Sequence, residues 1–179
     1  MTAEANNALR LQFLARVVRK ECQHLATTDQ RLFGNVFTME QATRLEEDPD
    51  LAERVEAFVG RFGRLQDTVG DKLLPLLLTA LGEKSSAAID NLDRAERLGL
   101  VKSADVWMTM RNLRNQMIHE YVEDPVVLII TNDLPSVFCW ASQMASSFIS
   151  ALQTGHDFVP ALIDAANKMI AEIERRNWA

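Results

Sequence analysis

The residues of this sequence that are best suited to chemistry lie together between Arg114 and Tyr121. His119 can accept and return a proton near neutral pH, as histidine side chains commonly do in enzymes. Arg114 carries a permanent charge that can bind a phosphate and stabilise a phosphoryl-transfer transition state. The amide of Asn115 can orient the imidazole or hold a substrate oxygen. These residue types favour metal-free RNA cleavage, in which the 2′-hydroxyl attacks the adjacent phosphate.

A helix is expected to carry these residues, from about Ser103, a good N-cap residue, to about Tyr121. On a wheel of about 100° per residue, the apolar side comprises Val106, Met110, Leu113, Met117 and Tyr121. The opposite arc comprises Met108, Arg111, Asn112, Asn115, Gln116 and His119. Asn is a poor helix former, so its repeated use in mid-helix calls for another reason. We therefore predict a binding face on this arc, with Arg111 and Asn112 contacting the substrate.

The spacing of Arg114 and His119 bears on how a site would be assembled. Five positions separate them, which is about 140° around a regular helix. They would converge on one ligand if the helix loosens at its end, or if a second copy of the chain completes the site. The spacing favours a composite site in a homodimer. Asn115, four positions before His119, can touch it directly.

Ordinary structural roles also account for each of these residues. A histidine near a helix C-terminus is commonly a surface residue that suits the helix dipole. Tyr121 is the only tyrosine and lies on the apolar side of the wheel, so it also fits a core position. Trp107, at the border of the two faces, is most simply half-buried packing. On residue types alone, the structural interpretation is the stronger one.

The spacing adds a family resemblance. Arg114-x4-His119-x-Tyr121 resembles the R-x4-H-x-Y signature of HepT toxins in the HEPN superfamily. A polar residue directly after the arginine, here Asn115, is also typical of that superfamily. The resemblance covers about residues 10–152. It implies an antiparallel bundle of four or five helices, with the motif late in the bundle.

The resemblance also implies an activity and partners. HEPN ribonucleases act without metal or cofactor, as homodimers whose motif helices face each other across the dimer axis. Arg114 and His119 would then be catalytic, with Asn115 supporting them. HepT-like proteins pair with a small MNT-type nucleotidyltransferase antitoxin, which adds AMP to the motif tyrosine, here Tyr121. The alternative is a non-catalytic HEPN subunit that presents substrate to, or regulates, a nucleotidyltransferase.

The amino-acid composition restricts the class of protein and the cellular location that these predictions can involve. The chain has 179 residues, 47% of them hydrophobic, which is ordinary for a globular protein. Its two cysteines, Cys22 and Cys139, form no CxxC motif, and no signal peptide or membrane span is apparent, so we expect a cytoplasmic protein. The net charge of −6 argues against non-specific coating of nucleic acid, although positive residues predominate between Arg94 and His119.

Scarce glycine and proline predict an all-α fold. The resemblance implies that its helices form an antiparallel up-and-down bundle, to which we add a C-terminal helix. Helices are expected at about 4–26, 50–81, 86–98, 103–121, 135–152 and 159–177. Thr38 and Gln41 have the spacing of a capping box for a further short helix, and Asp50 could cap the helix 50–81. The apolar stripe of that helix comprises Leu51, Val55, Phe58, Val59, Phe62, Leu65 and Val69.

A loop is expected at 27–38, a kink at Pro75 and a break at Gly155. We therefore divide the chain into a bundle, residues 1–155, and a C-terminal helix, residues 156–179. Because the last helix is expected to begin at about residue 159, His156, next to Gly155, would lie in the loop before it.

A second cluster of charges occurs on the predicted helix 50–81. Arg64, Asp67 and Asp71 have the spacing of an exposed face with ion pairs along one helix. Arg61 and Lys72 belong to the same cluster. Docking of the nucleotidyltransferase on this face is an alternative, but the structural interpretation is favoured.

Overall fold

The computed structural model describes residues 3–45, 47–84, 86–123, 135–176 and 178. The side chains of 3, 4, 43, 119–123 and 135–145 lie outside that description. The described residues contain helices and turns and no strand, which confirms the all-α prediction. None of the described helices has both the length and the apolar character that crossing a membrane requires.

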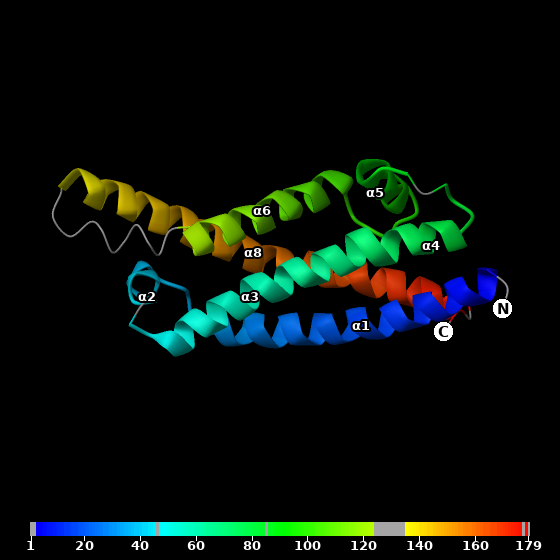
Figure 1. Cartoon of the computed structure of the whole chain (residues 1–179), viewed down its shortest axis with the longest axis horizontal. Helices are drawn as coiled ribbons and strands as arrows, with labels where there is room; N and C mark the ends of the chain where they lie inside the picture. Colours follow the sequence, from blue (N-terminus) through cyan, green and yellow to red (C-terminus); the bar gives the residue numbers. More distant parts are fainter. Residues whose placement is uncertain (1–2, 46, 85, 124–134, 177, 179) are drawn as a thin grey trace.

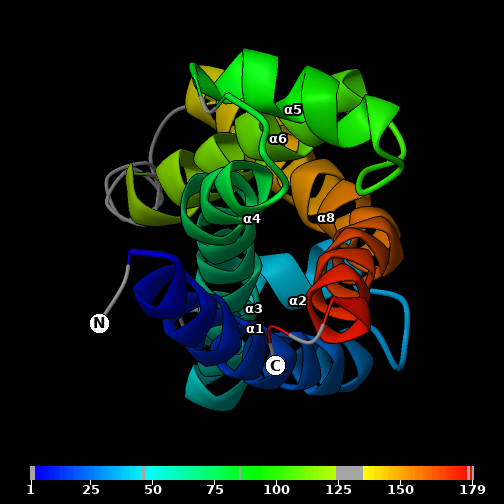
Figure 2. The same cartoon turned by 90° about the vertical axis from the view of Figure 1, so that its right-hand side faces the viewer.

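Long helices dominate the molecule. They are α1 (Ala3–Leu32), α3 (Pro49–Asp67), α6 (Ala104–Glu123) and α8 (Pro135–Arg175). Shorter elements connect them: α2 (Met39–Thr43), the π-helix η1 (Thr68–Leu73), α4 (Leu74–Ala80) and α5 (Ala88–Arg97). In Figure 1, α1 runs away from the end of the molecule that holds both termini, and α3, η1 and α4 return along it. Then α6 runs outward again and α8 returns beside it, while Figure 2 shows α5 across the end of α6.

The core lies between these long helices. The apolar stripe predicted on α3 is buried, as expected from its spacing. It comprises Leu51, Val55, Phe58, Val59, Phe62 and Leu65, continued in η1 by Val69. On α6 the predicted core residues Met110, Leu113 and Met117 are buried as well, with Trp107 1% exposed. The face of α6 that carries Arg114 is thereby positioned against α3 and η1.

The first helix is longer than predicted. It continues past Ala26 to Leu32, so the loop expected at 27–38 begins six residues late. The hydroxyls of Thr27 and Thr28 donate to the carbonyls of Gln23 and His24, which keeps these loop-prone residues inside the helix. The last helical turn of α1 is stabilised further because Leu32 is buried.

The capping residues at several helix ends agree more closely with the prediction than the length of α1 does. The capping box predicted at Thr38 and Gln41 is confirmed. The cap of α3 is Asp48, whose carboxylate accepts from the amide of Leu51 at 3.0 Å, and not Asp50 as predicted. Gly99 follows α5 with φ of +72°, the left-handed conformation expected of a glycine after a helix.

The two predicted interruptions have different outcomes. The α-helix is interrupted before Pro75, as expected, because the π-helical turns of η1 separate α3 from α4 and place this proline in the first turn of α4. The break at Gly155 is wrong, and the boundary drawn at residue 155 falls inside α8. A Cβ on Gly155 would lie 3.1 Å from Met117 Sδ and 3.3 Å from a Phe58 ring carbon. The glycine thus permits close packing of α8 and does not end a helix.

Candidate functional site

The start of α6 is held in place by its neighbours. Ser103 caps the helix as predicted, its hydroxyl accepting from the Val106 amide at 3.3 Å. Glu96, at the end of α5, accepts from the amide of Ala104 at 2.7 Å. The ring of Trp107 fills the space above Gly70, where a Cβ would lie 3.1 Å from a ring carbon. These contacts fix the rotation of α6 relative to η1.

Arg114 projects from α6 toward α3. Its Nη2 donates to Oδ2 of Asp67 at 2.6 Å, and its Nη1 donates to Oδ1 of Asn115 at 2.9 Å. Its Nε is buried and has no hydrogen-bond partner among the described residues. A guanidinium has five N–H donors, and these two bonds engage only two of them. Asn115 thus contacts Arg114, its neighbour in the sequence, and Arg114 keeps donors for a further acceptor.

Arg111 makes a parallel contact one turn earlier on α6. Its Nη1 and Nη2 donate to the two carboxylate oxygens of Asp71 at 3.1 and 3.3 Å. Asn112, the other predicted substrate-binding residue, is exposed on the outer side of the helix. Both predicted arginines of the motif helix therefore already face a carboxylate within this chain.

This pairing corrects the interpretation of the charges on helix 50–81. Asp67 and Asp71 do not form an ion pair with Arg64 within the described residues, but bridge to α6. Arg61 turns the other way, donating to the hydroxyl of Thr28 on α1. The cluster is therefore not one exposed face. Its carboxylates hold α6, while Arg64 and Lys72 remain exposed.

A shallow groove of about 300 Å³ lies over Arg114, between α3, η1 and α6. Three cations and one carboxylate lie around it, together with apolar and small residues. Its lining comprises Val59, Gly60, Gly63, Arg64, Asp67, Thr68, Lys72, Arg114 and Ile118. Because the cations exceed the carboxylate, the groove suits an anionic ligand such as a phosphate.

Glu21 of α1 adds a carboxylate beside this groove. Its Oε1 accepts from the hydroxyl of Thr68 at 3.3 Å, and its Oε2 is buried without a hydrogen-bond partner among the described residues. Burial raises the pKa of Glu21, and the Thr68 hydrogen bond and the charges of Arg64 and Lys72 oppose that rise. At a given pH, the protonated fraction of Glu21 is therefore larger than that of a solvated glutamate.

His119 and Tyr121 lie on the backbone of α6, and the directions of their side chains fall outside the described residues. The backbone around them is regular α-helix, which continues to Glu123. The helix thus does not loosen between Arg114 and His119. A loosened helix end, one of the two ways in which these residues could converge, is therefore not present here.

The sequence interpretation missed a contact between a histidine and an aspartate, His156 and Asp29. His156 lies within α8 and not in a loop, and its Nδ1 is 2.6 Å from Oδ1 of Asp29 on α1. Its ring stacks on Phe33 at a centroid distance of 4.5 Å. Since 127 positions separate the two partners, no local spacing could have indicated the pair. Among the described residues, no group of three or more His, Cys, Asp or Glu side chains is arranged to hold a metal ion.

Two glycines of α3 provide a test of the Arg114 geometry. A Cβ on Gly63 would lie 3.2 Å from Nε and 3.3 Å from Cγ of Arg114, whereas one on Gly60 would meet nothing within 4 Å. We expect Gly60→Ala to raise the free energy of unfolding by about 0.5–1 kcal/mol, the usual gain inside a helix. Gly63→Ala is expected to gain less than half of that, because Arg114 must shift from Asp67. Chemical denaturation of both variants measures the difference, and equal gains would contradict the described Arg114 position.

Comparisons with protein-family models, with curated proteins and with solved structures find no match for this chain.

Proposed function

We propose that this chain is a metal-independent endoribonuclease, the toxin of a HEPN/MNT-type toxin–antitoxin pair. The observation that carries the proposal is the placement of Arg114 on the rim of a groove that Arg64 and Lys72 make cationic. A groove of this charge is suited to an RNA phosphate. The motif that contains Arg114 also supplies His119, which can transfer protons at neutral pH.

The proposed reaction is an internal displacement at phosphorus. A His119 imidazole takes the proton of the 2′-hydroxyl, whose oxygen attacks the adjacent phosphate. The bond from phosphorus to the 5′-oxygen breaks, and an imidazolium returns a proton to that oxygen, which balances the one taken from the 2′-hydroxyl. The products are a 2′,3′-cyclic phosphate and a 5′-hydroxyl end. Arg114 would stabilise the additional negative charge on the phosphate oxygens during this step.

The proposed active form is a homodimer, an up-and-down bundle from each chain. Because Arg114 and His119 diverge by about 140° on a straight helix, Arg114 of one chain is proposed to act with the histidine of the other. Asn115 supports the site by holding Nη1 of Arg114 at 2.9 Å. Arg111 and Asn112 would contact flanking nucleotides.

The proposed partner is an MNT-type nucleotidyltransferase that adds AMP to Tyr121. A nucleotide attached two residues from His119 would obstruct the groove by its bulk and repel RNA by its charge. This part of the proposal rests on the position of Tyr121 in the motif. The proposed location of the pair is the cytoplasm.

A non-catalytic, regulatory HEPN subunit is the second candidate. The pairing of Arg114 with Asp67 and of Arg111 with Asp71 favours it, because both arginines already have carboxylate partners in the free chain. Such pairs also stabilise the contact between α6 and α3. In this case the motif helix would serve packing and partner binding, without cleavage.

The deciding experiment compares the wild-type chain with His119→Ala in growing cells and on purified RNA. Loss of a general acid–base group is expected to reduce cleavage by about 10²–10⁴-fold and to relieve growth arrest. His24→Ala is the matched control, since His24 is exposed on α1 and does not line the groove. If wild type and His119→Ala are equally harmless and neither cleaves RNA, the ribonuclease proposal fails.

A further inference from the structure

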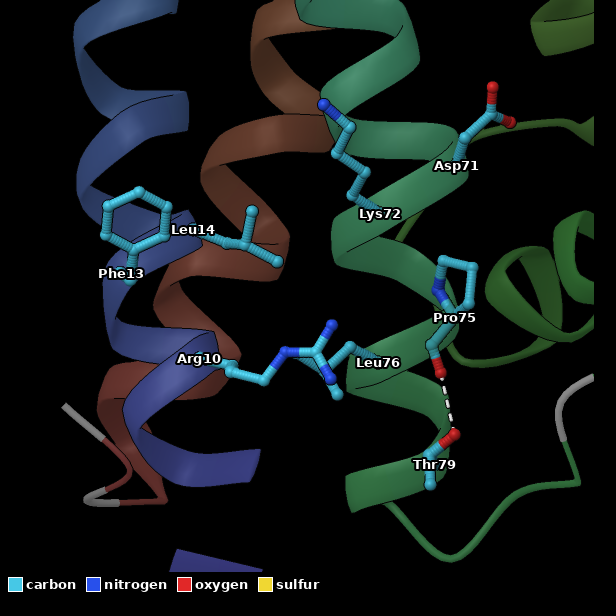
Figure 3. Close-up of a pocket in the computed structure, with 8 residues that line it drawn as sticks. All are labelled: Arg10, Phe13, Leu14, Asp71, Lys72, Pro75, Leu76 and Thr79. Atoms are coloured by element: carbon cyan, nitrogen blue, oxygen red, sulfur yellow. Dashed lines mark hydrogen bonds between the residues drawn. The ribbon is translucent and has the colours of Figure 1, made fainter. Parts of the chain in front are cut away.

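A second hollow lies next to the candidate site, between α1 and the segment formed by η1 and α4. It has a volume of about 480 Å³ and is drawn in Figure 3. Arg10 reaches across it from α1, and Lys72 leans toward α1 from the opposite wall. Asp71 points away from α1, toward its partner Arg111. The side of the hollow that faces solvent is therefore dominated by positive charge.

This hollow and the groove over Arg114 are neighbours, with Lys72 lining both of them. Phe13 also lines a third hollow of about 480 Å³, whose lining residues all belong to α1. The three hollows together form what we call the basic strip. Its charged lining comprises seven cations and two carboxylates: Arg10, Arg16, Arg19, Lys20, Arg64, Lys72, Arg114, Asp67 and Asp71.

The charge of the basic strip opposes that of the protein. The whole chain has a net charge of −6, yet cations outnumber carboxylates on this surface. Five of the cations form no ion pair within 4.0 Å among the described residues: Arg10, Arg16, Lys20, Arg64 and Lys72. Arg19 is paired with Glu174 at 2.6 Å. Glu21 is the further carboxyl group near Arg64 and Lys72, and it is partly buried. An excess of cations that form no close ion pair, on an acidic protein, points to an anionic ligand.

Phe13 supplies a different feature of the same surface. Its side chain is 58% exposed on the ridge between two hollows, and Figure 3 shows the ring directed away from η1 and α4. The adjacent Leu14, by contrast, packs against the core. An exposed aromatic ring among unpaired cations is the arrangement by which proteins bind single-stranded nucleic acid. Bases stack on the ring, and the cations follow the phosphates.

We propose that the basic strip binds a single-stranded segment of the RNA substrate, with one unpaired base stacked on Phe13. Arg10 and Lys72 would contact the phosphates between this base and the one bound at Arg114. The inference deepens the proposed function, on which it rests for the identity of the ligand. It predicts a preference for single strands, because a duplex does not present its base faces to a protein.

The test measures fluorescence anisotropy of a labelled twelve-nucleotide RNA against full-length protein carrying His119→Ala, which prevents cleavage. Adding Phe13→Ala is expected to weaken binding of the single strand by about tenfold, the usual range for one stacked base. Phe13→Trp should restore it. Ile89→Ala is the matched control, since Ile89 is 56% exposed on α5 and lines none of the three hollows.

The charged part of the strip is tested by salt dependence. Lys72→Gln should lower the slope of log K against log[salt] by about one, with an overall loss of affinity for every sequence. Lys168→Gln is the control, because Lys168 is on α8 and pairs with Asp164 at 2.8 Å. The same RNA annealed to its complement should bind more weakly than the single strand.

Two results would overturn the inference. One is unchanged affinity after Phe13→Ala together with equal binding of single strand and duplex. The other is a change in oligomeric state, by light scattering, on Phe13→Ala while RNA affinity is retained, which would identify a protein-docking face. Failure of the proposed function looks different: Phe13-dependent binding persists, but the wild-type chain cleaves no RNA. Conversely, if the wild-type chain cleaves RNA but binding does not depend on Phe13, the inference about the basic strip fails and the proposed ribonuclease function is unaffected.

Discussion

Replacement of Arg114 by alanine is expected to lower kcat/KM for RNA cleavage by about 10²–10³-fold, the usual cost of removing one donor that stabilises transition-state charge. Nη1 and Nη2 of Arg114 are positioned by Asn115 and Asp67, and the side chain lines the groove. The loss should fall mainly on kcat, because the developing charge exists only in the transition state. Arg114→Lys is expected to retain little activity, since lysine keeps the charge without the planar fork.

Arg111→Ala is the matched control for this substitution. Arg111 lies on the same helix and forms an equivalent ion pair, with Asp71 at 3.1 Å. We expect a loss of about tenfold or less, expressed in KM, because Arg111 is proposed to contact flanking nucleotides. Equal losses from both substitutions would mean that the general charge of the surface is responsible, and the assigned role of Arg114 would then be wrong.

Asp67→Asn separates the two candidate functions. If Asp67 is a positioning residue for Arg114, its loss should reduce kcat about tenfold. The change in unfolding free energy should stay below about 1 kcal/mol, because the pair is partly exposed. If the carboxylate instead keeps Arg114 occupied in a regulatory subunit, removing it would raise the affinity for RNA without producing cleavage. Single-turnover cleavage and RNA-binding titrations distinguish these outcomes.

Trp107→Ala is expected to destabilise the protein by about 3–5 kcal/mol, the usual cost of removing a buried large aromatic side chain. Trp107 is 1% exposed and is among the largest fully buried side chains. Its ring occupies the space above Gly70, so the substitution leaves a cavity between α6 and η1. In a chain of this size the melting temperature should fall by roughly 6–20 °C. Calorimetry or thermal circular dichroism would measure the shift.

Trp178→Ala provides the comparison. Trp178 is only partly buried near the chain end, with the Arg176 guanidinium 5.5 Å from its ring centre. Its loss is expected to cost less than about 1.5 kcal/mol. Trp107→Phe should recover part of the stability by refilling the space above Gly70. A Trp107→Ala variant no less stable than Trp178→Ala would show that α6 is not anchored there.

The prediction of Trp107 itself shows what a helical wheel can and cannot provide. The wheel placed it on the border between faces and favoured half-burial, yet it is almost completely buried. The opposing position, Gly70, lies on a different helix and has no side chain. A wheel describes one helix in isolation, so it could not include the space that this glycine provides.

By itself, the sequence determined the helical class and most of the core. Apolar spacing depends on one helix at a time, and Leu51, Val55 and Phe58 were assigned correctly on that ground. Caps such as Thr38 with Gln41 act within four residues, so they were also predictable. The motif from Arg114 to Tyr121 is a property of the sequence too, and its proposed function stays a prediction.

Only the tertiary structure decided how the charged residues are partnered. Asp67 and Asp71 bond to arginines 47 and 40 positions away, and Asp29 meets His156 across 127 positions. Spacing along one helix suggested ion pairs within that helix, because such spacing contains no information about the residues of a neighbouring helix. The basic strip has the same origin, since Arg10 and Lys72 share a hollow only because α1 packs against η1. Distance through space, set by the packed core, determines which charges meet and which remain for a ligand.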